Sequence, residues 1–357
     1  MKNVRPIFVA LTTMLILITI QSTTAHAQFG GYTGSSLQLG FDAQSVALGD
    51  AVSAGFSKHN PMDSTDLEVQ PYYNPALAAS NTSNTHFSLS VFQLGLDRHY
   101  QSLGARLALP PKAGLFIGLI RAGVHDIDTR SLSGYPLGMV STSDVQLQSA
   151  FGIRLSERVH AGIGFKINRA DYHAEMKAST IVGVDIGMLF KLSQHTRWAF
   201  VVQDLLAEHT WNSGDLYNQP QSRNRVEAMP LRLKTSVSTY VMDTNLFAEY
   251  EIKRFSSEVT TRELFLSDGA SVQYVETLET RFTSASFLRV AASRSLHPFF
   301  RLHMGWNRYL CGLSSNEWRS GFSLSMPFQP ALKVDYGFST SSDHLKSTHI
   351  FTLRYIL

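Results

Sequence analysis

The chain has 357 residues, 31 Lys and Arg against 28 Asp and Glu, a formal net charge of +3 and one cysteine, Cys311. Charged residues make up 17% of it, below the roughly 25% of an average soluble protein, and the mean hydropathy is −0.05. This composition excludes a disulfide framework, a Cys-rich metal site, extended disorder and a polytopic helical membrane protein, and it gives no reason to expect a nucleic acid partner. It fits a transmembrane β-barrel, whose strands each combine an apolar face with a polar one.

The first 27 residues have the three parts of a secretory signal peptide. Lys2 and Arg5 precede an apolar stretch over 7–20, and Ala-His-Ala at 25–27 places small residues where signal peptidase reads them. The apolar stretch is shorter than the about 20 residues that a transmembrane helix needs. We therefore expect cleavage after Ala27 and export to the outer membrane of a Gram-negative-type bacterium.

Apolar and polar residues alternate with period 2 from about residue 85 to the C-terminus, which is typical of strands with two unlike faces. Short turns separate some of these segments, and long polar connections over 124–143, 206–230 and 255–284 separate others. That asymmetry is the outer-membrane pattern. We predict an all-β fold: a transmembrane antiparallel β-barrel of about 14 strands over 85–357, embedded in outer-membrane lipid. Because residues 272–282 also alternate weakly, the number of strands could differ from 14 by two. The 14 predicted strands lie near 85–95, 98–109, 113–123, 144–155, 158–168, 180–192, 196–205, 231–241, 245–254, 285–294, 300–308, 317–326, 331–340 and 347–357.

The alternation also assigns faces. Val184, Ile186 and Val334 should face lipid, whereas Gly187 and Lys333 should face the lumen. Repeated glycines on the polar faces suit a lumen that another segment fills, because small side chains leave room for it. Charged residues on predicted lumen faces should form ion pairs that hold this segment, in preference to a transport relay. They are Asp185, Lys191, Lys234, Glu249 and Arg354.

Residues 28–84 do not alternate and are rich in Gly, Ser, Ala and Asn. A 14-stranded barrel is too wide for its own side chains to fill, so we expect this segment to be a hatch inside the lumen. Asn74-Pro75-Ala76 should form an ordered turn, because Pro75 fixes φ and Asn74 can bond its own backbone.

Two stretches of this segment carry a family resemblance. The run Gln-Ser-Val-Ala-Leu-Gly-Asp-Ala over 44–51, which contains Gly49, and the run Tyr-Tyr-Asn-Pro-Ala-Leu over 72–77 precede the first strands directly. This resembles the FadL-type outer-membrane barrels, and most closely their PorV/PorQ branch, which carry such motifs in an N-terminal hatch inside a 14-stranded barrel. The resemblance makes Gly49, Asn74, Pro75 and Ala76 the hatch motif. Residues 57–70 depart from the family pattern as an insertion between the two motifs.

The resemblance implies two functions. The first is a component of the type IX secretion system that binds exported cargo proteins or partner subunits through long loops, and it is the leading hypothesis. The alternative is a FadL-like channel for uptake of hydrophobic small molecules. Beside these two, a third hypothesis is an orphan barrel with a structural role only. FadL-type channels open their wall at a kinked third strand, and the glycines at 114, 118 and 123 would permit a kink or pack against the hatch.

The sequence gives no sign of catalysis. Among its 13 histidines, the pairs His297/His303 and His344/His349 have no Cys or carboxylate frame for zinc, and no Gly-x-Ser-x-Gly elbow is present. We therefore predict no catalytic residue, metal or cofactor. An interfacial girdle is predicted from aromatic residues near strand ends: Trp198, Tyr240, Trp306, Tyr309, Trp318 and Tyr355.

Overall fold

The computed structural model describes residues 32, 34–57, 68–80, 84–173, 176–211, 225–266, 272–310, 316–341 and 347–357. The predicted signal peptide, its cleavage site and most of the insertion over 57–70 lie outside these residues. Within the described part of the chain, no helix has both the length and the apolar character to cross a membrane.

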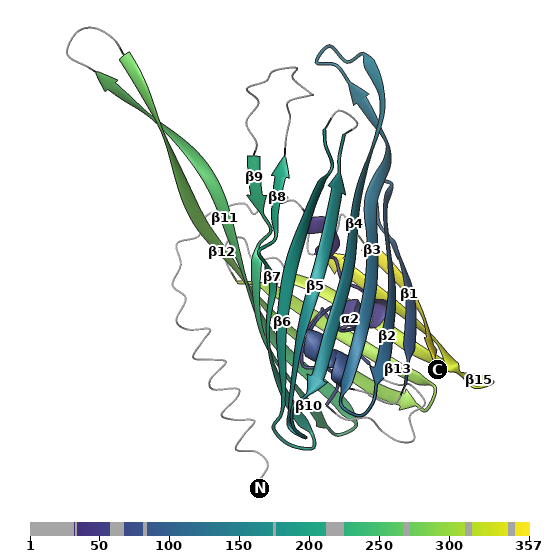
Figure 1. The fold of residues 1–357 in the computed structure, drawn as a ribbon. Helices are drawn as coiled ribbons and strands as arrows, with labels where there is room; N and C mark the ends of the chain where they lie inside the picture. Colours follow the sequence, from purple (N-terminus) through teal and green to yellow (C-terminus); the bar gives the residue numbers. More distant parts are fainter. Residues whose placement is uncertain are drawn as a thin grey trace.

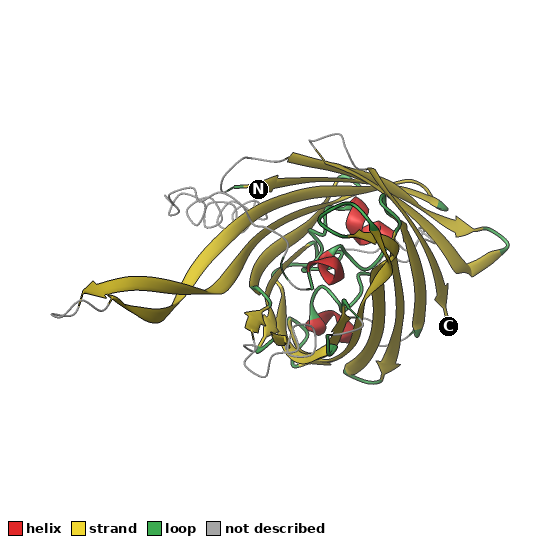
Figure 2. Cartoon of the chain, turned by 90° about the horizontal axis from the view of Figure 1, so that it is seen from above, coloured by secondary structure: helices red, strands yellow, loops and turns green. Residues whose placement is uncertain are grey.

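Fourteen antiparallel strands close into one barrel (Figures 1 and 2). The first strand completes the ring by pairing with the last, from His86↔Ile356 to Gln93↔His349. The predicted 14-stranded barrel is thus confirmed. Its strands are β1 (His86–Gln93), β2 (Arg98–Leu109), β3 (Ala113–Arg130), β4 (Pro136–Arg154), β5 (Val159–Asp171), β6 (Ser179–Lys191), β7 (Thr196–Leu205), β10 (Leu231–Val241), β11 (Thr244–Leu266), β12 (Val272–His297), β13 (Phe300–Tyr309), β14 (Asn316–Met326), β15 (Gln329–Ser341) and β16 (Ser347–Ile356). A separate two-stranded sheet joins β8 (Glu208–Trp211) to β9 (Arg225–Ala228).

The two faces of the strands differ as the alternation predicts. Val182 and Ile186 are 54% and 46% exposed on the outer face of β6, and similar apolar residues surround the barrel. Asp185 and Lys333 are buried on the inner face. An apolar belt outside and charged groups inside is the arrangement that a barrel needs in hydrocarbon.

The two rims of the barrel also differ (Figure 1). Tight turns join strands at the lower rim, such as Met242-Asp243, whose φ angles of 49° and 60° match a type I′ hairpin. At the upper rim two hairpins project, β3–β4 and β11–β12. The prediction of long loops over 124–143 and 255–284 is wrong, because most of these residues continue the strands. β11 has 23 residues and β12 has 26, against the 9–11 or so that cross a bilayer. Outside lipid a ribbon needs no apolar face, so the sequence of these extensions carries little alternation.

Three short helices lie inside the barrel (Figure 2): η1 (Ser35–Gln38), α2 (Ala43–Ala47) and η2 (Pro75–Ala79). Polar side chains begin two of them. Asp42 accepts a hydrogen bond from the Ser45 N–H at 2.8 Å, and Asn74 accepts one from the Ala76 N–H at 3.0 Å, as N-cap residues do. We call the described residues 34–57 and 68–80 the hatch. Aromatic contacts join it to the wall, such as Phe56 to Phe247 with ring centroids 5.1 Å apart.

Glycines of the inner wall lie where the hatch backbone touches it. A Cβ built on Gly114 would lie 1.9 Å from the carbonyl oxygen of Ala78, and one on Gly162 would lie 2.3 Å from the carbonyl carbon of Pro75. These distances are too short for any other residue unless the backbone moves. The glycines of β3–β6 therefore make room for η2.

Replacing Gly162 with alanine should destabilise the barrel by about 1–3 kcal/mol, the usual cost of overpacking a tight contact. Urea unfolding in lipid vesicles measures this. The matched control is Gly95→Ala, because a Cβ at Gly95 meets nothing within 4 Å. Equal stability of the two variants would contradict the close approach of η2 to β5.

Candidate functional site

Buried ion pairs cross one side of the lumen. Lys166 Nζ lies 2.8 Å from Asp185 Oδ2 and 2.8 Å from Asp204 Oδ1. Next along the wall, Arg232 Nε lies 2.6 Å from Glu251 Oε1, and Arg289 pairs with Glu251 and, at 3.0 Å, with Glu249. Each cation thus has a carboxylate partner, which is the condition for holding charges away from water.

The ion pairs extend to the hatch. Glu249 accepts a hydrogen bond from the backbone N–H of Ser53 at 3.2 Å. Gln203 donates to the carbonyl oxygen of Tyr72 at 2.9 Å and to Asp185 at 3.3 Å. The wall network and the hatch therefore form one connected polar structure.

An irregularity in β7 brings Asp204 into this network. The pairing between β6 and β7 shifts from Val184↔Leu205 to Ile186↔Val202, and Asp204 has a φ of 63°. Gln203 and Asp204 are consequently both buried on the lumen side, although neighbours in a regular strand point to opposite faces.

The five predicted lumen residues have different surroundings. Asp185 and Glu249 belong to the network, and Lys234 is buried with Nζ 6.0 Å from the ring centroid of Tyr73. Arg354 pairs with Asp335 at 2.5 Å elsewhere in the lumen. Lys191 is half-buried at the lower rim and is not part of the network. The central members of the network, Lys166, Asp204, Arg232, Glu251 and Arg289, are not among the five predicted lumen residues. Alternation places all of them except Asp204 on the polar face of their strands, which was a usable signal.

The hatch motif residues also have identifiable contacts. Asn74 Nδ2 donates to the carbonyl oxygen of Ser53 at 2.8 Å and to that of Met188, in β6, at 3.4 Å. Pro75 and Ala76 lie against Gly162. Gly49 has a φ of 64°, and a Cβ there would lie 2.3 Å from the side chain of Asn307, so this turn requires glycine.

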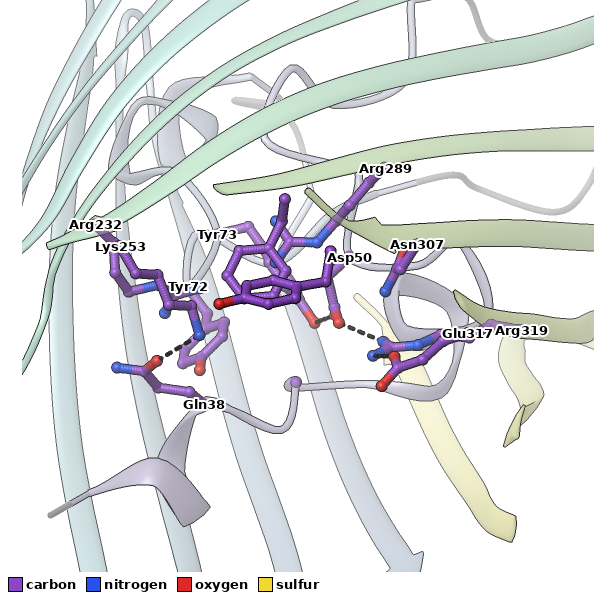
Figure 3. A pocket seen from close by; sticks show the side chains of 13 residues that line it. Gln38, Asp50, Tyr72, Tyr73, Arg232, Lys253, Arg289, Asn307, Glu317 and Arg319 are labelled. Carbon is purple, nitrogen blue, oxygen red and sulfur yellow. Dashed lines mark hydrogen bonds and ion pairs between the residues drawn. The ribbon is translucent and has the colours of Figure 1, made fainter. Parts of the chain in front are cut away.

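A cavity of about 150 Å³ lies between the hatch and the wall (Figure 3). Its wall residues Arg232, Tyr309 and Glu317 lie at the strand ends away from the lower-rim turns. Its walls carry four cationic side chains, two acidic ones and several aromatic rings. We call it the upper chamber. Its lining residues are Gln38, Gly40, Asp50, Tyr72, Tyr73, Arg232, Lys253, Phe287, Arg289, Asn307, Tyr309, Glu317 and Arg319.

Hydrogen bonds order the floor of the upper chamber. Tyr73 donates its hydroxyl to Asp50 at 2.9 Å, and Arg319 lies 2.5 Å from the same carboxylate. Lys253 Nζ donates to the amide oxygen of Gln38 at 3.1 Å and to the hydroxyl of Tyr32 at 3.3 Å. Burial raises the pKa of Tyr72 to about 12, so this phenol stays neutral. The chamber can therefore hold the polar end of a molecule while its rings contact an apolar part.

The glycines of the third strand take the packing role, one of the two roles considered for them. Gly114 and Gly118 pack against Ala78 and Phe41 of the hatch. The pairing of β3 with β4 is regular from Ala113 to Val124 and shifts its register after Val124. The girdle prediction is wrong for Tyr309, which lines the upper chamber.

The charge of Asp42 should make hatch packing pH-dependent. Burial raises the pKa of this carboxyl from 3.8 to about 6, against the opposing effect of Arg354. Because the folded-state pKa is the higher one, the stability that comes from protonating Asp42 is present below pH 4 and is lost as pH rises through 6. Asp42→Asn, which keeps an N-cap side chain, should stabilise the protein at pH 7.5 and have no such effect at pH 4 in urea unfolding. A stabilisation of equal size at both pH values would contradict this.

Comparisons with known proteins show the fold. No family model matches the chain, and no curated protein matches it. The CymD monoaromatic hydrocarbon channel is 12% identical and superposes with a TM-score of 0.56 over 91% of this chain and 98% of its own. The Ralstonia pickettii toluene transporter TbuX is 11% identical and superposes with a TM-score of 0.57 over 90% of this chain and 99% of its own. A Pseudomonas aeruginosa FadL homologue is 10% identical and superposes with a TM-score of 0.57 over 88% of this chain and 98% of its own. The chain therefore has the 14-stranded barrel fold of FadL-type hydrocarbon channels.

Proposed function

We propose that this protein is an outer-membrane channel for the uptake of small hydrophobic molecules. The observation that carries the proposal is the upper chamber, which combines rings from Tyr72, Tyr73, Phe287 and Tyr309 with cationic groups between the hatch and the wall. The named neighbours that share the fold over nine-tenths of the chain are hydrocarbon channels. The channel for hydrophobic small molecules, which was only the alternative hypothesis from the sequence, is therefore the leading one.

The membrane position follows from the shape of the barrel. Short turns characterise the periplasmic rim of outer-membrane barrels, and long hairpins the outer rim. The lower rim then faces the periplasm, and the upper chamber faces the outside. A solute would meet the chamber first and would need a shift of the hatch to pass further.

Uptake of radiolabelled para-methylphenol, an aromatic ring with one polar end, by cells that express the full chain tests the proposal. We expect faster accumulation than in cells without it. Gln38→Trp should abolish the gain, because Gln38 lines the small chamber and indole fills much of it. The matched control is Ser133→Trp on the exposed tip of the β3–β4 hairpin, which should transport normally. Equal uptake with and without the protein would refute the channel.

A second candidate is the leading hypothesis from the sequence, binding of a secreted cargo protein or a type IX secretion subunit. The tip of the β3–β4 hairpin favours it, because Leu132, Tyr135, Leu137 and Met139 are between 70% and 112% exposed. Apolar side chains exposed at a projecting tip are typical of protein contacts. No comparison supports this function, so it ranks second.

Co-purification from the native membrane tests this second candidate. The native chain and a variant with Ser at Leu132, Tyr135 and Leu137 would be isolated side by side. A partner protein that is retained by the native chain and lost by the variant would support docking at the tip. The same set of proteins with both chains would refute it.

A further inference from the structure

Four basic side chains meet on the inner face of the wall at the lower rim. They come from consecutive strands: Arg154 is the last residue of β4, His160 the second of β5, Lys191 the last of β6 and Arg197 the second of β7. Arg154 is the cross-strand partner of His160, and Lys191 is the partner of Arg197. The positive charges of Arg154, Lys191 and Arg197 all act on the His160 ring. We call these four residues the basic cluster.

The basic cluster has no acidic partner among the described residues. The network cations Lys166, Arg232 and Arg289 each lie within 3.0 Å of a carboxylate, whereas no ion pair joins any of the four to a described residue. The acidic residue closest in sequence is Glu157, whose negative charge attracts the ammonium group of Lys191. Its side chain is exposed on the turn between β4 and β5, outside the inner face.

Two polar groups of the cluster are buried without a partner. His160 is 0% exposed, and neither of its ring nitrogens has a hydrogen-bond partner. The buried Arg154 Nε also lacks one. Arg197 packs against the hatch, where a Cβ on Gly55 would lie 3.6 Å from its Nη1. Buried polar groups are normally satisfied. A buried imidazole without a partner, beside the partly exposed cations Arg154, Lys191 and Arg197, points to an anion-binding site.

We propose that the basic cluster binds an oxyanion, the carboxylate or phosphate group of a small solute or lipid. Two guanidinium groups offer planar forks that match such groups, Lys191 adds a point charge, and the buried imidazole adds an N–H donor. Arg197 lies against the hatch, so the anion would lie between wall and hatch at the periplasmic mouth. This site lies at the rim opposite the upper chamber and does not depend on the proposed uptake function.

Calorimetric titration with inorganic phosphate tests the site, using the full chain in phosphatidylcholine nanodiscs. We expect binding by the native protein and a Kd at least tenfold weaker in Arg154→Gln/Lys191→Gln, because the variant loses two cationic hydrogen-bond donors. The matched control is Arg158→Gln, which removes an exposed charge from the neighbouring turn and should leave the Kd unchanged. Gln38→Trp should also leave it unchanged, which separates this site from the upper chamber.

The lipid composition distinguishes the two sources of the oxyanion. Weaker phosphate binding in discs with phosphatidylglycerol assigns the site to a lipid head group, and equal binding assigns it to a soluble anion. Either outcome supports an oxyanion site. Heat-dependent gel migration checks that each variant is a folded barrel. No phosphate binding by the native protein in phosphatidylcholine, or an unchanged Kd in the double variant, would overturn the proposal.

Discussion

Replacing Lys166 with methionine should destabilise the folded barrel by about 3–5 kcal/mol, the cost of removing one partner from a buried ion pair. Lys166 Nζ lies 2.8 Å from both Asp185 and Asp204, and the two carboxylates are 0% and 3% exposed. Without the ammonium group they would repel each other in a region closed to water. Urea unfolding in lipid vesicles gives the difference in free energy of unfolding.

Two further variants isolate the charge effect. Lys177→Met removes an exposed lysine from the connection before β6 and should change stability little. Adding Asp185→Asn and Asp204→Asn to Lys166→Met should recover much of the loss, because no unpaired charge then remains. A loss below about 1 kcal/mol for Lys166→Met would show that water screens the pair and that the lumen is open there.

Arginine at Val334 should cost about 2–4 kcal/mol, the penalty for a cation on the lipid face near the bilayer midplane. Val334 lies mid-strand on the outer face of β15, between Leu324 and Leu353 of the neighbouring strands. The introduced arginine would have to extend its side chain along the apolar belt to bring its charge to the membrane–water interface. Refolding titrations in lipid vesicles compare the variant with the native protein.

The matched control for this face is Thr340→Arg. Thr340 precedes the last residue of β15 and lies on the same face at the upper rim, where the penalty falls to about 0–1 kcal/mol. Equal costs at the two positions would contradict the membrane position of the belt. A Val334→Arg variant as stable as the native protein would contradict the face assignment itself.

The barrel could be predicted because membrane strands must alternate. Hydrocarbon outside and a polar lumen inside act on every residue of a segment such as Val182–Lys191, so the pattern appears in the sequence. The hairpin extensions of β3–β4 and β11–β12 could not be predicted, because they project beyond the barrel (Figure 1). Antiparallel pairing holds them there without a one-sided apolar pattern.

The site was less predictable, because it depends on departures from regular structure. Asp204 faces the lumen only because β7 shifts its register, and a period of 2 assigns neighbours to opposite faces. The upper chamber joins hatch residues such as Tyr73 to Arg319 of β14, residues that are far apart in the chain. No local spacing records such a contact.

The place of the hatch inside the barrel is tested most directly by a disulfide between Ser57→Cys and Asn245→Cys, in a chain that also carries Cys311→Ser. The Ser57 hydroxyl of the hatch donates to Asn245 Oδ1 of β11 at 3.1 Å, so each position already holds a side chain that points at the other. In oxidised native membranes both thiols should resist a maleimide label until a reductant is added. The control pair Ser57→Cys and Gly95→Cys should take up label without a reductant. Free, labelled thiols in the Ser57→Cys/Asn245→Cys chain would contradict a hatch packed against β11.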